Sequence, residues 1–115
     1  MPTSPEITPG TMVWAELDPA TGREQGGRRP VLVVASRGYL DVIDQLALAV
    51  PITSVDRGWP NHVELAGLGR PSFAMTEQLR AVLQARLHGV LGVAATEELQ
   101  QVRRWLGDFL DLPPL

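Results

Sequence analysis

Two apolar runs flank a loop rich in glycine and arginine near the start of the chain: Met12-Val13-Trp14-Ala15-Glu16-Leu17, then Gly22-Arg23-Glu24-Gln25-Gly26-Gly27-Arg28-Arg29-Pro30, then Val31-Leu32-Val33-Val34. The alternation in the first run and the β-branched residues in the last predict two strands. Glycines let the loop backbone come close to a ligand, and adjacent arginines present planar donor forks that suit phosphate oxygens. Taken alone, adjacent arginines such as Arg28 and Arg29 are more often solvated loop residues than ligand-binding ones. The choice between these two roles therefore depends on the rest of the chain.

Further short apolar segments continue the β pattern. Strands are predicted over residues 12–17, 30–35, 46–53, 62–65, 72–75 and 89–93, with Pro51 marking an edge or a bulge. Because the turns are short and the strands follow one another, the pattern suits a small antiparallel barrel. The predicted fold class is mainly β, with one C-terminal helix.

The helix is predicted to follow Thr96, which can cap it, with Glu97 and Glu98 favourable at the positive end of the helix dipole. Pro113-Pro114 is expected to end it. One stripe recurs at three- and four-residue intervals and should pack on the sheet: Leu99, Val102, Leu106, Phe109 and Leu110. The residues expected to face away are Gln100, Gln101, Arg103 and Arg104.

Length and composition limit the possible functions. The 115 residues suit one domain over 1–115, with residues 1–9 expected to fray. The absence of cysteine excludes disulfides and thiolate chemistry. The N-terminus lacks the features of a targeting signal and no apolar run is long enough for a membrane span, so we expect a soluble, cytoplasmic protein.

Charge is segregated along the chain. The formal net charge is −3, which by itself argues against a nucleic-acid partner, yet residues 20–37 and 70–95 together carry +5. No metal-ligand motif accompanies His62 and His88, so neither a metal nor another cofactor is expected. A catalytic histidine pair is conceivable, but a packed or surface role is the commoner one for each of them.

Four ordered motifs resemble MazF/PemK/Kid-type toxins of bacterial toxin–antitoxin modules, from about Gly10 to Leu112. They are Val13-Trp14-Ala15-Glu16-Leu17-Asp18-Pro19; Gly22-Arg23-Glu24-Gln25 with Arg29-Pro30-Val31-Leu32-Val33-Val34; Val50-Pro51-Ile52-Thr53-Ser54; and Glu77-Gln78 with Arg80. The resemblance implies an SH3-like, CcdB-type barrel and a homodimer controlled by a MazE-like antitoxin. It also implies a metal-independent endoribonuclease that leaves 2′,3′-cyclic phosphate and 5′-hydroxyl ends on single-stranded RNA.

The resemblance assigns the main catalytic arginine to Arg29 and the catalytic threonine to Thr53, with Arg28 as an RNA contact. Chemistry agrees, because a guanidinium and a hydroxyl donor stabilise charge that develops on the phosphate oxygens. Arginine is a poor base, so Glu24 and Glu77 are the carboxylates available to take the 2′-hydroxyl proton, and the choice between them stays open. This chain has Arg23 and Tyr39-Leu40 where family members often have histidine and Tyr-Asn.

The remaining candidate RNA contacts lie mainly in the loops 19–29 and 54–61: Arg23, Gln25, Ser54, Arg57 and Trp59, with Gln78 and Arg80 farther along the chain. Trp59 could stack on a base or pack in the protein, with equal support for each. Trp14 is expected in the core. Trp105 lies off the main helix stripe and is expected either at the border of that stripe or in a dimer interface. Two alternatives remain open: a CcdB-like gyrase poison and a non-catalytic RNA- or antitoxin-binding barrel.

Overall fold

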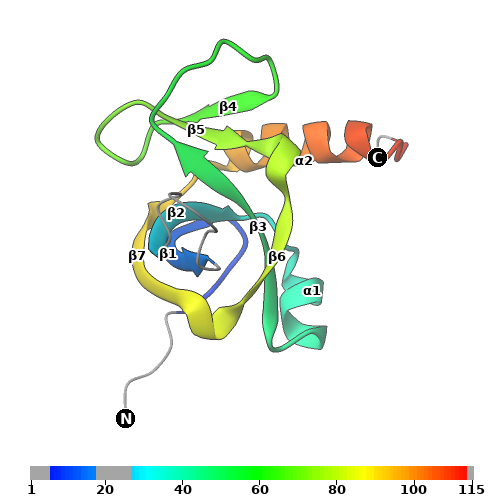
Figure 1. Cartoon of the computed structure of the whole chain (residues 1–115). Coiled ribbons are helices and arrows are strands. Elements are labelled where there is room, and N and C mark those ends of the chain that lie inside the picture. The colour runs from blue at the N-terminus through cyan, green and yellow to red at the C-terminus, as the bar shows by residue number, and fades with distance from the viewer. Residues whose placement is uncertain (1–5, 18–26, 114–115) are drawn as a thin grey trace.

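Seven strands and two α-helices make up the part of the chain that the structure describes (Figure 1). A computed structural model describes residues 6–17 and 27–113. The strands are β1 (Thr11–Leu17), β2 (Gly27–Val33), β3 (Leu46–Thr53), β4 (His62–Leu65), β5 (Ser72–Met75), β6 (Arg80–Leu83) and β7 (Leu87–Val93). The helices are α1 (Arg37–Val42) and α2 (Thr96–Phe109), with short 3₁₀ turns η1 (Thr76–Gln78) and η2 (Gln84–Arg86).

Five antiparallel strands curve into a barrel in the order β7-β1-β2-β3-β6 (Figure 1). Strand β3 belongs to two layers: residues 46–49 pair with β6, and residues 52–53 pair with β5. Strand β5 in turn pairs with β4, so a hairpin leaves the barrel at the end of β3. Helix α2 packs against β4 and η1. The predicted class, mainly β with a C-terminal helix, is confirmed.

The core has two parts that share the central strands. Val31 and Val33 pack into the barrel interior with Val13, whereas Leu32 faces the other side, towards Val102 of α2 and the hairpin. Because both faces are covered, the end of β2 reads as a continuous apolar run rather than an alternating one.

Two elements carry no clear signal in the sequence. Helix α1 has six residues, too few to show a helical period, and begins where Ser36 Oγ accepts a hydrogen bond from the Tyr39 amide at 3.0 Å. Strand β6 buries only Val82, so it has no alternating pattern of apolar residues. Strand β2 covers 27–33 instead of the predicted 30–35, because its pairing with β1 continues to Gly27 opposite Leu17.

Both predicted ends of α2 are wrong. Ala95, not Thr96, is the N-cap, and its amide donates to Glu98 Oε1 at 2.9 Å. The helix ends at Phe109, before the prolines, in a Schellman motif: Leu112 N donates to Gly107 O at 2.8 Å, and Asp111, with φ of 59°, is in the left-handed region.

The apolar stripe of α2 is shorter than predicted. Leu99, Val102 and Leu106 pack against the core, but Phe109 and Leu110 are 50% and 62% exposed. Arg103 does not simply face solvent: its guanidinium donates to the Val34 and Ala35 carbonyls, both at 3.1 Å. These two bonds attach the helix to the segment that directly follows β2.

The N-terminal segment is partly described. Ile7 packs against the barrel core, and the Thr8 amide donates to Thr11 Oγ1 at 3.1 Å, so residues 7 and 8 are held within the segment expected to fray. Residues 1–5 lie outside the described part. Within 6–17 and 27–113, no helix combines the length and the apolar character needed to cross a bilayer.

Candidate functional site

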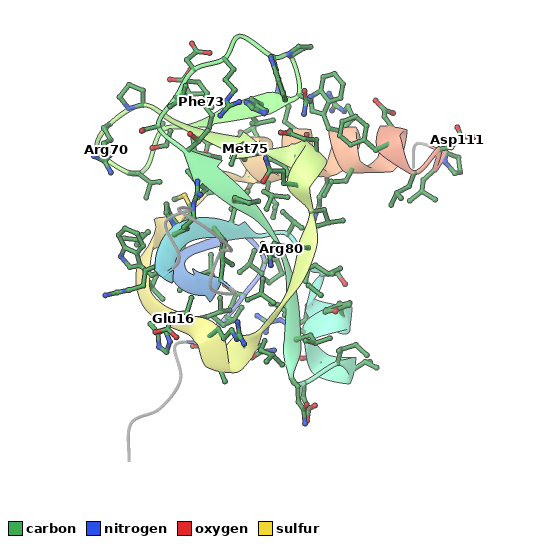
Figure 2. All side chains as sticks on the ribbon, in the orientation of Figure 1. Glu16, Arg70, Phe73, Met75, Arg80 and Asp111 are labelled. Carbon is green, nitrogen blue, oxygen red and sulfur yellow. The ribbon has the colours of Figure 1, made fainter. Side chains whose placement is uncertain are left out.

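A pocket of about 380 Å³ lies between the barrel and the β4–β5 hairpin. The turn that joins β4 to β5 contributes Arg70, which Figure 2 shows on this turn. Leu68 comes from the same turn, and the other lining residues come from β1, β2, the end of β3, β5 and β7: Trp14, Arg28, Arg29, Pro30, Ile52, Thr53, Ser54, Ser72 and Leu91.

The antiparallel pairing of β2 with β3 brings two motifs that are far apart in sequence to the same pocket. The register joins Val31 to Pro51 and Val33 to Ala49. Arg29 precedes these pairs on β2 and Thr53 follows them on β3, so both residues lie at the same end of the two strands. Both line the pocket.

The pocket is strongly cationic. Arg28, Arg29 and Arg70 line it, and no aspartate or glutamate is among its described lining residues. Guanidinium groups bind phosphate oxygens through paired N–H donors. The pocket therefore suits an anion, and a phosphate in particular.

Trp14 forms a wall of this pocket rather than part of the core, so the prediction of a core role is wrong. It is only partly buried, and the Arg28 guanidinium lies 5.4 Å from its ring centroid. A Cβ added at Gly89 would lie 3.4 Å from Trp14 Cδ1, so a larger residue there would crowd the ring. The indole thus orients Arg28 by a cation–π contact.

Thr53 is set up as a hydrogen-bond donor to a ligand. Its side-chain oxygen accepts from the Val55 amide at 3.1 Å, and the residue is half-buried. A hydroxyl has one proton to donate and two acceptor positions. Since the amide uses an acceptor position, the proton stays free to point into the pocket.

Apolar side chains complete the pocket. Ile52, Leu68 and Leu91 line it beside the arginines. Apolar and aromatic surface next to cationic groups suits a ligand with both a flat ring and a phosphate, which is the composition of a nucleotide.

Glu77 does not line this pocket. Its carboxylate binds His62 Nε2 at 3.0 and 3.1 Å and accepts from Asn61 Nδ2 at 2.8 Å. Partial burial tends to raise the pKa of Glu77, yet the bonds from His62, from its own backbone amide and from Asn61 lower that pKa below its ordinary value of 4.5. The carboxylate is therefore ionised at neutral pH and is a weaker base than a free one.

Trp59 and Arg57 lie on the 54–61 loop, outside the pocket lining. Trp59 is 46% exposed, and its ring centroid lies 4.8 Å from that of His62, whose side chain is only 2% exposed. Arg57 lies 5.8 Å from the Trp59 ring centroid. One face of the indole thus contacts the protein while much of the ring remains open to solvent.

Other predicted site residues lie elsewhere. Arg80 lies on β6 (Figure 2) and lines a second pocket, of about 200 Å³, with Glu16 and Arg86. The side chain of Gln78 donates to Met75 Sδ at 3.7 Å. Arg23, Glu24 and Gln25 lie outside the described residues.

Four of the site residues predicted from the sequence line the main pocket: Arg28, Arg29, Thr53 and Ser54. The prediction missed two further polar lining residues, Arg70 and Ser72. Arg70 follows Gly69 in the turn between the strands predicted over 62–65 and 72–75. A basic residue in this turn was the one sequence feature that could have indicated its role. That signal is weak, because only the folded hairpin reveals that Arg70 lines the same pocket as Arg28 and Arg29.

Known proteins resemble this chain over nearly its whole length. It is 34% identical over 95 residues to the endoribonuclease toxin MazF of Escherichia coli K12, covering 82% of this chain and 85% of that protein. It is 32% identical over 110 residues to the endoribonuclease MazF9 of Mycobacterium tuberculosis, covering 87% and 93%.

A crystal structure of MazE-MazF from Deinococcus radiodurans has a TM-score of 0.78 and 34% identity, covering 93% of this chain and 97% of that one. Residues 8–110 match the sequence profile of the PemK-like, MazF-like toxins of type II toxin-antitoxin systems. The resemblance predicted from the four motifs is confirmed, and the chain belongs to this toxin family.

Proposed function

We propose that this chain is a sequence-specific endoribonuclease toxin that cleaves single-stranded RNA without a metal ion. The observation that carries the proposal is the meeting of Arg29 and Thr53 in a cationic pocket, with no carboxylate among the lining residues described. The relatives named endoribonucleases support it.

In the proposed reaction, the 2′ oxygen of a ribose attacks the adjacent phosphorus. A bond from phosphorus to the 2′ oxygen forms and the bond to the 5′ oxygen breaks, leaving a 2′,3′-cyclic phosphate and a 5′-hydroxyl. Negative charge grows on the non-bridging oxygens, where the Arg29 guanidinium and the Thr53 hydroxyl donate hydrogen bonds. The 2′ proton passes to a general base, and the leaving 5′ oxygen takes a proton from solvent.

Glu24 is the carboxylate that we propose as this base. Glu77 is bound by His62 and Asn61, lies outside the pocket lining and has a lowered pKa, all of which disfavour it. Glu24 belongs to the same arginine loop as Arg28 and Arg29 in the sequence.

The RNA strand is proposed to extend beyond the pocket. Arg28 and Ser54 lie at its lining, and the exposed Trp59 beside Arg57 offers a stacking platform on the adjoining loop. Gln78 and Arg80, which lie outside the pocket lining, are proposed as further contacts. Arg23 and Gln25 are proposed as contacts from their place in the sequence beside Arg28 and Arg29.

We also propose that the toxin is a cytoplasmic homodimer inhibited by a MazE-like antitoxin. The MazE-MazF structures from Deinococcus radiodurans support the antitoxin, and an acidic antitoxin segment would complement the cationic pocket. Exposed apolar side chains at the end of α2 support the dimer: Phe109, Leu110 and Leu112.

The direct test incubates the purified chain with a long RNA transcript in EDTA and identifies the ends of the products. Cleavage that leaves cyclic phosphate and 5′-hydroxyl ends is expected. Cleavage that stops with EDTA and returns with magnesium would contradict the mechanism. Intact RNA combined with inhibition of gyrase supercoiling would favour the gyrase-poison alternative.

A further inference from the structure

The turn between β4 and β5 brings Arg70 to the arginine pocket in a defined conformation. Gly69 has φ of +79°, a left-handed value that glycine adopts without strain. The buried Ser72 donates its hydroxyl to the Arg70 carbonyl at 3.1 Å. The backbone on both sides of Arg70 is therefore constrained.

Two glycines let the hairpin approach the barrel closely. A Cβ added at Gly92 on β7 would lie 3.3 Å from Met12 Cε and 3.6 Å from the Gly67 carbonyl, and one added at Gly67 would lie 3.4 Å from Met12 Cε. A side chain at either position would displace the Met12 methyl group slightly and fill the space between the turn and β7. The absence of such a side chain lets the turn residue Leu68 and the β7 residue Leu91 line one pocket.

The carboxylate of Glu98 connects this hairpin to α2. Its Oε2 accepts from the Ala66 amide at the start of the turn, at 2.9 Å, and its Oε1 accepts from the Ala95 amide at the helix N-cap, also at 2.9 Å. Glu98 is only partly exposed. One side chain thus caps the helix and fixes the turn that carries Arg70.

We infer that Arg70 binds a backbone phosphate of the RNA, and that Glu98 is the positioning residue that holds its hairpin against the pocket. This inference rests on the proposed RNA-binding function of the pocket. Arg28 and Arg29 approach from the barrel and Arg70 from the hairpin. A strand of RNA can therefore have phosphates held from both sides while its bases meet Trp14, Leu68 and Leu91.

The test measures binding rather than cleavage. The probe is a mixed-sequence single-stranded RNA whose 2′-hydroxyls are replaced by fluorine, so it cannot be cut, and its Kd is followed by fluorescence anisotropy over a range of salt concentrations. Arg70→Ala should weaken binding about tenfold. It should also reduce the slope of log K against log salt by about 0.7. Arg70→Lys should keep most of that slope because it keeps the charge.

The matched control is Arg104→Ala, an exposed arginine on α2 outside the pocket lining, which should bind as the wild type does. Binding by Arg70→Ala that equals the wild type at every salt concentration would overturn this inference and leave the proposed nuclease intact. A wild-type chain that neither binds the probe nor cleaves the long transcript would overturn both.

The role of Glu98 is tested by its coupling to Arg70. Glu98→Ala should weaken RNA binding in the wild type but cause little further loss in the Arg70→Ala background, because the two residues act through one contact. Glu97→Ala controls for the loss of an acidic residue in the same helical turn. Equal losses with and without Arg70, or a Glu97→Ala effect as large as that of Glu98→Ala, would overturn the positioning role.

Discussion

Thr53 and Arg29 illustrate how single side chains acquire a role from their partners. The Val55 amide occupies an acceptor position on the Thr53 oxygen, and the antiparallel pairing of β2 with β3 places Arg29 at the same end of the two strands as Thr53. The residue types alone do not specify this hydrogen bond or this placement. Both follow from the surrounding backbone.

Replacing either residue should therefore reduce cleavage without unfolding the protein. Arg29→Ala should abolish cleavage, and Thr53→Val should lower kcat by about one to three powers of ten, because each removes a transition-state donor. Arg37→Ala, at an exposed position on α1, is the control and should cleave normally. Rates of initial cleavage and melting temperatures measure the two effects, and wild-type rates in both variants would place the active site elsewhere.

Trp59 is more exposed than a core residue, which favours stacking on RNA over packing. Trp59→Ala should cost about 1–3 kcal/mol of RNA binding and change the pattern of cut sites, while the melting temperature changes little. Mapping cuts on one long transcript and measuring the melting temperature of the same sample distinguishes the two roles. A large fall in melting temperature with an unchanged pattern would assign the indole to packing against His62.

At the C-terminal end of α2, the apolar stripe predicted from the sequence differs from the residues that are buried in the structure. Apolar spacing predicted the helix and its buried middle, but it also extended the stripe to Phe109 and Leu110, which are exposed. Periodicity reports which residues share a helix face. It does not report where the sheet beneath that face ends.

Asp111 provides a test of the Schellman motif. Its φ of 59° is a conformation that costs a side-chain-bearing residue free energy, so Asp111→Gly should stabilise the fold by about 0.5–1 kcal/mol. Asp108→Gly, inside the helix, should instead destabilise it by about 0.3 kcal/mol, the difference in helix propensity between aspartate and glycine. Urea denaturation measures both changes, and a loss of stability in Asp111→Gly would show that this geometry does not end the helix.

The His62–Glu77 pair links the stability of the whole molecule to pH. Because the folded-state pKa of Glu77 lies below 4.5, the unfolded chain binds the proton more tightly. The stabilisation is therefore complete above about pH 4.5 and is lost as the pH falls through the lowered folded-state pKa. Glu77→Gln should remove this part of the acid dependence of the urea midpoint.

Glu64→Gln is the matched control, since Glu64 is exposed on the same hairpin. It should leave the acid dependence of the midpoint close to that of the wild type. An equal flattening in the two variants would show that the His62 contact does not control this dependence.

Association of two chains should depend on the exposed apolar end of α2. Leu110→Glu should convert the expected dimer to a monomer, because it places a charge where an apolar surface would be buried. Val42→Glu, a 77% exposed apolar position on α1, is the control and should remain dimeric. Sedimentation at micromolar concentration measures the oligomeric state. A monomeric wild type would contradict the dimer, and a dimeric Leu110→Glu variant would show that the interface lies elsewhere.

Periodicity and motif spacing are enough to predict the strand-rich class, the C-terminal helix, the toxin family and the candidacy of Arg29 and Thr53, because these signals can be read along the chain. The folded structure was needed to show that Trp14 lines the pocket, that Glu77 is bound by His62 and that Arg70 joins the other arginines. These facts depend on strand register and on the close approach of Gly67 to Gly92. Contacts between distant segments are set by packing, which no local pattern records.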